Sequence, residues 1–178
     1  MRITLAIDTS TSRTSVALIE DGVILWSRHR DGATEHGPAL PSLVQEGIKG
    51  FVIDEVVVGM GPGPFTGLRV GIAFAQSFAL ARGISVRGVC SLDAIAAQVN
   101  EKDFIVTVDA RRKEVYWARY KDGVRVGEPA VSFPADVAGA PIHADLFPDM
   151  KALVALSGNI TEPVYLRRPD AVATADCT

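Results

Sequence analysis

The sequence feature that most constrains the fold is an internal repeat. The segments IDTSTSRTSVALIEDG (7–22) and VDARRKEVYWARYKDG (108–123) share one plan, and the second copy lies 101 residues after the first. Each copy has the end of an apolar strand, an aspartate, a polar turn, a second strand and an Asp-Gly pair. An Asp-Gly pair between two strand-like runs is typical of a β-hairpin. Because such hairpins are common, coincidence is the alternative to duplication.

Duplication predicts an α/β protein of two lobes, a first lobe over residues 1–100 and a second over residues 101–178. Each lobe opens on a strand that ends in an aspartate, Asp8 or Asp109. If the two lobes face each other, these two carboxylates flank the cleft between them. The second lobe is the smaller one, because fewer residues remain for it and many of them are Pro, Ala or Asp.

Hydrophobic periodicity indicates the other elements. The run EVVVGM lacks alternation, as does a strand that is buried on both faces. Strands are expected over residues 3–7, 14–20, 23–30, 55–60 and 85–90. Helices are expected over residues 38–48, 67–82, 91–100 and 146–156, with Ser91 as the N-cap of the third.

The stretch GMGPGPFTGLRVG (59–71) joins a strand-like run to a helix-like run, a place where glycines often form phosphate-binding loops. No lysine follows the glycines as in a Walker A loop, and Thr66 stands where the third glycine of the dinucleotide-binding motif would fall. Pro62 and Pro64 remove two backbone N–H donors. We therefore interpret the stretch as a rigid turn that aims the next helix, with Thr66 as its cap. Anion binding by the N–H groups after Thr66 is the alternative.

The expected helix 67–82 carries two apolar faces, one more than an amphipathic surface helix needs. One face holds Leu68, Ile72, Ala75 and Ala79, and the other holds Val70, Phe74, Phe78 and Ala81. The second face is covered either inside the domain or by a partner protein, and we favour the partner.

Composition excludes several functional classes. The 178 residues carry a net charge of −3 and a pI of about 5.6, so no overall attraction to nucleic acid is expected. No stretch approaches the ~20 apolar residues of a membrane span, and the N-terminus lacks the apolar core of a signal peptide. Cys90 and Cys177 form neither a disulfide framework nor a zinc pattern. A cytoplasmic protein without membrane contact is expected.

Several stretches together resemble the TsaB (YeaZ) family, the bacterial partner proteins in synthesis of threonylcarbamoyladenosine on tRNA. They are LAIDTSTSRTSVAL (5–18), GMGPGPFTGLRVGIAFAQSFALARG (59–83), GVCSLDAIA (88–96), VDARRKEVYWARY (108–120) and EPVYLRRPD (162–170). The resemblance implies the duplicated fold of actin, Hsp70 and sugar kinases (ASKHA), in agreement with the repeat. The last two stretches are closer together than is usual in the family, which implies a shortened second lobe.

Relatives of the TsaD type perform the transfer chemistry with a metal held partly by two histidines four residues apart, in an NHLEAH-like stretch. The matching stretch here is CSLDAI (90–95), with Ser91 and Ile95 at the histidine positions. A hydrocarbon side chain cannot bind a cation, and a serine hydroxyl is a poor substitute for imidazole. The resemblance therefore implies a scaffold without a metal site or catalytic residue. A small ATPase or kinase of this fold and a glycoprotease-like metallopeptidase are the enzymatic alternatives.

The expected partner is a TsaD-like catalytic subunit, bound through helix 67–82 and the helix near 38–48. The interface is expected at Phe65, Leu68, Arg69, Ile72, Phe74, Ala75, Leu40 and Leu43. A TsaE-like ATPase is a further expected partner, and tRNA is contacted indirectly through the complex. A second copy of the chain would compete for the same surface as a homodimer.

Nucleotide binding depends on the polar turns. Asp8, followed by Thr9, Ser10 and Thr11, resembles the first phosphate loop of the fold, and Asp109 is the matching position in the second lobe. Kinases of this fold use such an aspartate with metal and nucleotide. We favour the alternative, an aspartate that accepts hydrogen bonds within its own turn. No intrinsic cofactor is expected, and ATP would bind only weakly or at the partner interface.

Two other polar features receive a structural interpretation. His36 resembles a family position at the start of the first short helix, and we interpret it as a helix residue rather than a ligand. The basic turn of Arg111, Arg112 and Lys113 is interpreted as a solvated loop. Contact of this turn with tRNA phosphate or with a partner carboxylate is the alternative.

Overall fold

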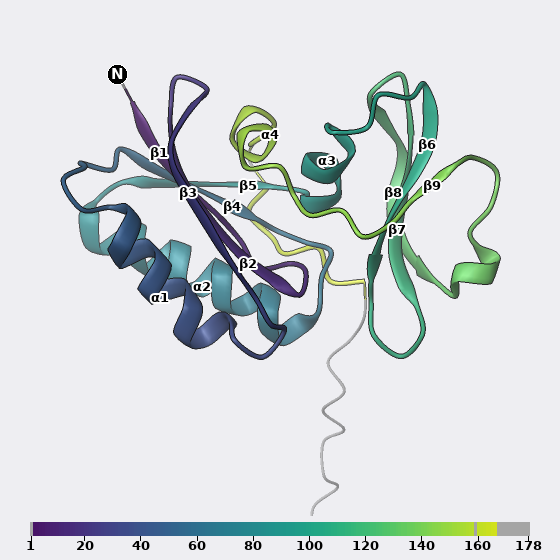
Figure 1. Ribbon diagram of the computed structural model, residues 1–178, viewed down its shortest axis with the longest axis horizontal. Coiled ribbons are helices and arrows are strands. Elements are labelled where there is room, and N and C mark those ends of the chain that lie inside the picture. The colour runs from purple at the N-terminus through teal and green to yellow at the C-terminus, as the bar shows by residue number, and fades with distance from the viewer. Residues whose placement is uncertain (1, 159, 167–178) are drawn as a thin grey trace, which may run out of the picture.

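The computed structural model describes residues 2–158 and 160–166, which form two sheets side by side (Figure 1). The first sheet has the strand order β3-β2-β1-β4-β5 and the second β8-β7-β6-β9. The first contains β1 (Ile3–Asp8), β2 (Arg13–Glu20), β3 (Val23–Asp31), β4 (Glu55–Gly59) and β5 (Ser85–Val89). The second contains β6 (Asp103–Asp109), β7 (Val115–Lys121), β8 (Val124–Ser132) and β9 (Ile142–His143).

The internal repeat forms the same antiparallel meander twice. In the first sheet β1 pairs with β2 and β2 with β3, and in the second β6 pairs with β7 and β7 with β8, all antiparallel. Asp8 ends β1 opposite Ser15, and Asp109 ends β6 opposite Val115. The prediction of a duplicated α/β fold is confirmed.

Helices cover both faces of the first sheet (Figure 1). They are α1 (His36–Gly47), α2 (Phe65–Arg82), α3 (Ser91–Ala96) and α4 (Met150–Ala155), and a short 3₁₀ turn, Pro134–Asp136, follows β8. On one face α1 and α2 bury side chains such as Leu5, Ile7 and Val58. On the other face α4 and Ala94 of α3 bury the alternate residues, such as Ala6 and Val57. This alternation is the physical reason for the unbroken apolar run of β4.

The chain returns to the first sheet after β9, so the predicted continuous lobe 101–178 differs from the observed arrangement. Met150 and Leu153 of α4 pack against the first sheet. Beyond α4, the N–H of Gly158 donates to the carbonyl of Gly88 at 3.0 Å, and the N–H of Val164 donates to that of Met60 at 2.8 Å. Among the residues that the structure describes, the strands of the second sheet therefore all lie within residues 103–143.

Several helix boundaries differ from the sequence-based expectations. Helices α1 and α2 begin at His36 and Phe65, each two residues early, and α3 ends at Ala96. Thr66 is not a cap, because the N-cap of α2 is Pro64. Ser91 is not a cap either. Cys90 occupies that position, and the Ser91 hydroxyl is used elsewhere. The last helix is shorter than expected, since it begins only after Asp149, whose carboxylate accepts from the N–H of Ala152 at 2.8 Å.

Candidate functional site

The turn after β1 is closed around the carboxylate of Asp8, which is only 1% exposed. Its Oδ1 accepts from the N–H and the hydroxyl of Ser10 at 2.9 and 2.8 Å. Its Oδ2 accepts from the hydroxyl of Ser91 at 2.7 Å, and a Cβ at Gly59 would collide with the same oxygen. Burial raises the pKa of Asp8, and the three hydrogen bonds oppose that rise. The carboxylate thus accepts hydrogen bonds within its own turn, as the favoured interpretation predicted.

The matching turn after β6 has the same internal hydrogen bond and the opposite exposure. Oδ1 of Asp109 accepts from the N–H of Arg111 at 2.9 Å, and the Asp109 side chain is 68% exposed. Arg111, Arg112 and Lys113 all have positive φ, at 63°, 54° and 64°. Left-handed backbone costs an L-residue about 1–2 kcal/mol. The two copies of the repeat thus agree in hydrogen bonding and differ in backbone conformation.

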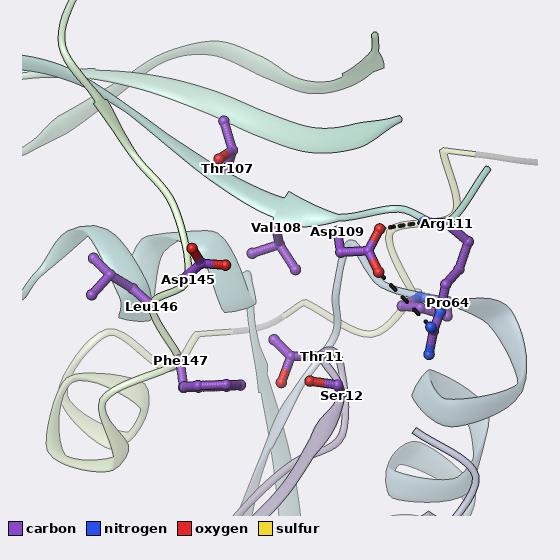
Figure 2. A pocket seen from close by; sticks show the side chains of 10 residues that line it. All are labelled: Thr11, Ser12, Pro64, Thr107, Val108, Asp109, Arg111, Asp145, Leu146 and Phe147. Atoms are coloured by element: carbon purple, nitrogen blue, oxygen red, sulfur yellow. Dashed lines mark hydrogen bonds and ion pairs between the residues drawn. The ribbon is translucent and has the colours of Figure 1, made fainter. Parts of the chain in front are cut away.

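A small cavity of about 80 Å³ lies between the two turns (Figure 2). Its lining comes from both turns, the end of β6, the start of α2 and a segment before α4: Thr11, Ser12, Pro64, Thr107, Val108, Asp109, Arg111, Asp145, Leu146 and Phe147. Asp109 therefore borders the space between the sheets, as predicted, whereas Asp8 does not. Pockets that hold small-molecule ligands are several times larger, at about 300–1,000 Å³.

The segment 144–149, which we call the strap, joins β9 of the second sheet to α4 on the first sheet, and three of its residues line this cavity. The Arg13 guanidinium lies 3.8 Å from the centre of the Phe147 ring. The Gln98 amide donates to the carbonyl of Phe147 at 2.7 Å. The strap therefore holds the Phe147 ring near the start of β2 and the residues just after α3. No motif in the sequence had indicated this contact.

The glycines of the 59–71 loop allow close packing against the turn after β1. A Cβ at Gly63 would collide with the backbone of Ser10, one at Gly67 with the ring of His36, and one at Gly71 with the side chain of Thr9. The Thr9 hydroxyl donates to the carbonyl of Gly67 at 2.8 Å and accepts from the N–H of Gly71 at 3.2 Å. The loop therefore serves to position α2, in agreement with the rigid-turn interpretation.

His36 begins α1 and is buried there. Its Nδ1 lies 2.8 Å from the hydroxyl of Thr14, and its ring touches the position of Gly67. Burial lowers the pKa of His36, a hydrogen bond to the backbone of Thr11 opposes this, and the charge of Arg111 adds to it. A neutral imidazole packed between two helix starts fits the structural interpretation of His36.

The two positions that the family resemblance matched to metal-binding histidines lie in closed surroundings. The Ser91 hydroxyl donates to Asp8, and the side chain of Ile95 is completely buried with Leu92 and Phe104. Across residues 2–158 and 160–166, no three His, Cys, Asp or Glu side chains are grouped so that they could hold a metal ion.

Five of the eight predicted interface residues lie in the core of the first sheet. Their exposed fractions run from 0% to 6%, and they are Leu40, Leu43, Leu68, Ile72 and Ala75. We correct their assignment, because side chains that bury the face of their own sheet cannot also meet a partner. The prediction failed because helical spacing identifies an apolar face without saying which of two faces meets the sheet. Arg69 is exposed and Phe65 and Phe74 are half-buried, so for these three the interface stays a prediction.

Comparison with known proteins identifies the family. The model for the family "TsaD: tRNA N6-adenosine threonylcarbamoyltransferase" matches residues 30–171. The tRNA threonylcarbamoyladenosine biosynthesis protein TsaB of Escherichia coli is 38% identical over 141 residues, with 72% of this chain and 60% of that protein covered. A YeaZ structure from Pseudomonas aeruginosa superposes with a TM-score of 0.74 at 28% identity and covers 88% of this chain and 90% of that one. The chain belongs to the TsaB (YeaZ) family.

Two other proteins show how this TsaB-family chain compares in length and in fold. An uncharacterized protein of Mycobacterium tuberculosis is 44% identical over 203 residues, covering 98% of this chain and 96% of that protein. Because the alignment is longer than the 178 residues here, that relative has segments without a counterpart in this chain. The ethanolamine utilization protein EutJ of Carboxydothermus hydrogenoformans, 12% identical, superposes over 74% of this chain and 52% of that one with a TM-score of 0.50, which reflects the shared ASKHA fold alone. No helix within the described part of the TsaB-family chain is long and apolar enough to span a membrane.

Membership of the TsaB family gives a role in the biosynthesis of threonylcarbamoyladenosine on tRNA. Sequence reasoning found the turns and the glycine loop, and it missed the contacts of Thr9 and Ser91 because each joins segments more than 50 residues apart. The only local signal was the residue types, a threonine and a serine that are mostly exposed in proteins and completely buried here.

Proposed function

We propose that this chain is a non-catalytic subunit that binds and activates a TsaD-like threonylcarbamoyltransferase. The closed environment of Ser91 and Ile95 carries the proposal. Where a catalytic relative holds a metal, this chain has a hydroxyl bonded to a buried carboxylate and an isoleucine in the core. Opening that region to a substrate would expose Asp8 and remove its hydrogen bonds, so the chemistry is assigned to the partner.

The exposed face of α2 is the surface proposed for the partner. Thr9 fixes the first turns of this helix, and the side of the helix opposite the exposed face packs on the sheet. The residues left in solvent at helical spacing are Arg69, Ala73, Gln76, Ser77 and Leu80. Leu80 is 85% exposed, and the small side chain of Ala73 allows a partner helix to approach closely. Partner binding to one conformation of the catalytic subunit would shift its population toward activity.

Charge substitutions on the exposed face test the proposal without touching the core. Ala73→Glu and Leu80→Asp are expected to weaken the mixed complex with the TsaD-like protein at least tenfold, measured by light scattering, and to reduce its threonylcarbamoyl transfer to tRNA in parallel. Val124→Asp, at a position 68% exposed on the second sheet, is the matched control. A wild-type chain that forms no complex, or variants that bind as wild type, would contradict the proposal. Ile72 is unsuitable because a charge there would disrupt the core.

A second copy of the chain is proposed to use the same face when the partner is missing, since an isologous contact and the mixed complex would compete. A TsaE-like ATPase completes the proposed assembly. Titrating the TsaD-like protein into the isolated chain, at a constant concentration of this chain, should convert homodimer to mixed complex. A complex in which two copies of this chain pair through α2 while the TsaD-like protein is also bound would contradict shared use of that face.

No intrinsic nucleotide is proposed for this chain. The cavity that Asp109 lines has a volume of about 80 Å³, smaller than a nucleotide, and a second hollow of about 330 Å³ has neither Asp8 nor Asp109 in its lining. The buried Asp8 carboxylate has no free access to a metal–phosphate group. Calorimetric titration of the isolated chain with ATP and Mg²⁺ should give no saturable heat. Saturable binding that is lost in Asp8→Ala would overturn this and favour a small ATPase or kinase.

A further inference from the structure

The basic turn of Arg111, Arg112 and Lys113 has a backbone that its residue types do not favour. In the described part of the chain, the other non-glycine residues with positive φ are Asp21, Asp122 and Asp145. Aspartate tolerates left-handed backbone because its short side chain bonds locally. Arginine and lysine lack a short acceptor side chain of this kind, and unfavourable backbone that a protein retains is a reason to look for function.

The first copy of the repeat shows that the hairpin itself does not require this conformation. The matching turn Ser10–Ser12 has the same hydrogen bond from the residue two positions after the aspartate, without any positive φ. At the matching positions of the first copy Ser10 and Thr11 are buried and Ser12 is exposed, whereas the three basic side chains of the second copy are all exposed. Successive residues of a left-handed turn point about 100° apart, so the three cations are spread out rather than gathered on one point.

The turn reaches the cavity between the sheets through Arg111, close to Pro64 at the start of α2 (Figure 2). Arg111 lines that cavity with Pro64 and Thr11, and its charge contributes to the lowered pKa of His36 at the start of α1. Its ion pair with Asp109 is 3.9 Å long and both side chains are more than half exposed. Such a pair is weak, so the guanidinium is available to a stronger anion.

We propose that the turn Arg111–Lys113 contacts the phosphate backbone of tRNA. The inference deepens the proposed function and rests on it. Spread cations match successive phosphates of a polyanion, whereas a small anion or a single carboxylate would need them to converge on one point. The chain has a net charge of −3, so any attraction to tRNA must be local. This turn supplies three adjacent exposed cations, of which Arg111 lines the same cavity as Pro64 at the start of α2.

Salt-dependent binding of fluorescent tRNA tests the inference. The full chain, alone and with the TsaD-like protein, is titrated between about 50 and 200 mM salt, the range over which phosphate contacts change affinity strongly. The double variant Arg111→Gln/Lys113→Gly is expected to lose on the order of tenfold in affinity, and the slope of log K against log salt should fall by about 1 for each cation removed. Glycine at 113 keeps the left-handed backbone, so thermal unfolding should show an intact fold.

Lys102→Gln is the matched control, since it removes one exposed cation from the other end of β6 and should leave tRNA affinity unchanged. Wild-type affinity and slope in the double variant would overturn the proposal. So would unchanged tRNA affinity with a weakened mixed complex, which would make the turn a protein contact. Failure of the proposed function gives a different result: the wild-type chain forms no complex, while the variant still lowers tRNA affinity of the isolated chain.

Discussion

The hydroxyl of Ser91 donates a 2.7 Å hydrogen bond to the carboxylate of Asp8, across 83 residues of sequence. The same hydroxyl accepts from the N–H of Gly61 at 3.3 Å, so it links the end of β1, the start of α3 and the glycine loop. Ser91 stands at a position that the resemblance to TsaD-type relatives matches to a metal-binding histidine. In this chain the position instead closes the first sheet around a buried carboxylate.

Ser91→Ala should therefore destabilise the fold by about 1–3 kcal/mol, because it leaves one buried carboxylate oxygen and one buried N–H without a partner. Urea unfolding followed by circular dichroism measures the change. Ser42→Ala, on the exposed side of α1, serves as the control. Equal stability of the wild type and Ser91→Ala would show that water replaces the hydroxyl.

Asp8→Asn should change how stability depends on pH. Burial raises the pKa of Asp8 in the folded state above its ordinary value of 3.8, so the folded chain holds this proton more tightly than the unfolded chain. The wild type therefore loses stability relative to the variant as pH rises from about 3.8 through the raised pKa. Urea unfolding of both proteins at intervals between about pH 4 and pH 8 tests this. A stability difference that is constant over this range would contradict a raised pKa.

Gly71→Ala should destabilise the chain by about 1–3 kcal/mol, since the new methyl group would collide with the Thr9 side chain that holds α2. Gly37→Ala adds the same methyl group to exposed helix with nothing nearby, and should be neutral or stabilising by up to about 1 kcal/mol. Thermal unfolding compares the two. If Thr9→Ala partly restores the stability of Gly71→Ala, the collision is with Thr9.

Tyr120→Phe should cost about 1.5–3 kcal/mol, because the buried hydroxyl donates to the charged Asp93 at 2.7 Å. Asp93 also accepts from Arg125 at 2.9 Å, and together the three residues tie α3 to the second sheet. Tyr116→Phe is the control on the same strand face, as the Tyr116 hydroxyl bonds to no other described residue. Equal losses in chemical denaturation of the two variants would show that Asp93 adds nothing to Tyr120.

The sequence by itself determined the duplicated plan of the protein. Alternation and the Asp-Gly turns are local patterns, and local backbone preferences act the same way in any fold. The recurrence of these patterns 101 residues later is visible in the sequence itself. The rigid-turn interpretation of the glycine loop was also accessible, because Pro62 and Pro64 remove donors whatever surrounds them.

Only the tertiary structure decided which side chains are available. Leu68 and Ile72 of α2 read as an exposed interface in the sequence and lie in the core, because two apolar faces on one helix give no sign of which meets the sheet. The burial of Asp8, against the exposure of Asp109, depends on Gly59 and Ser91, which come from segments distant in sequence. Likewise, the contact of Phe147 with Arg13 joins segments that are far apart in the sequence. Burial is a property of contacts between distant segments, and periodicity within one segment does not contain it.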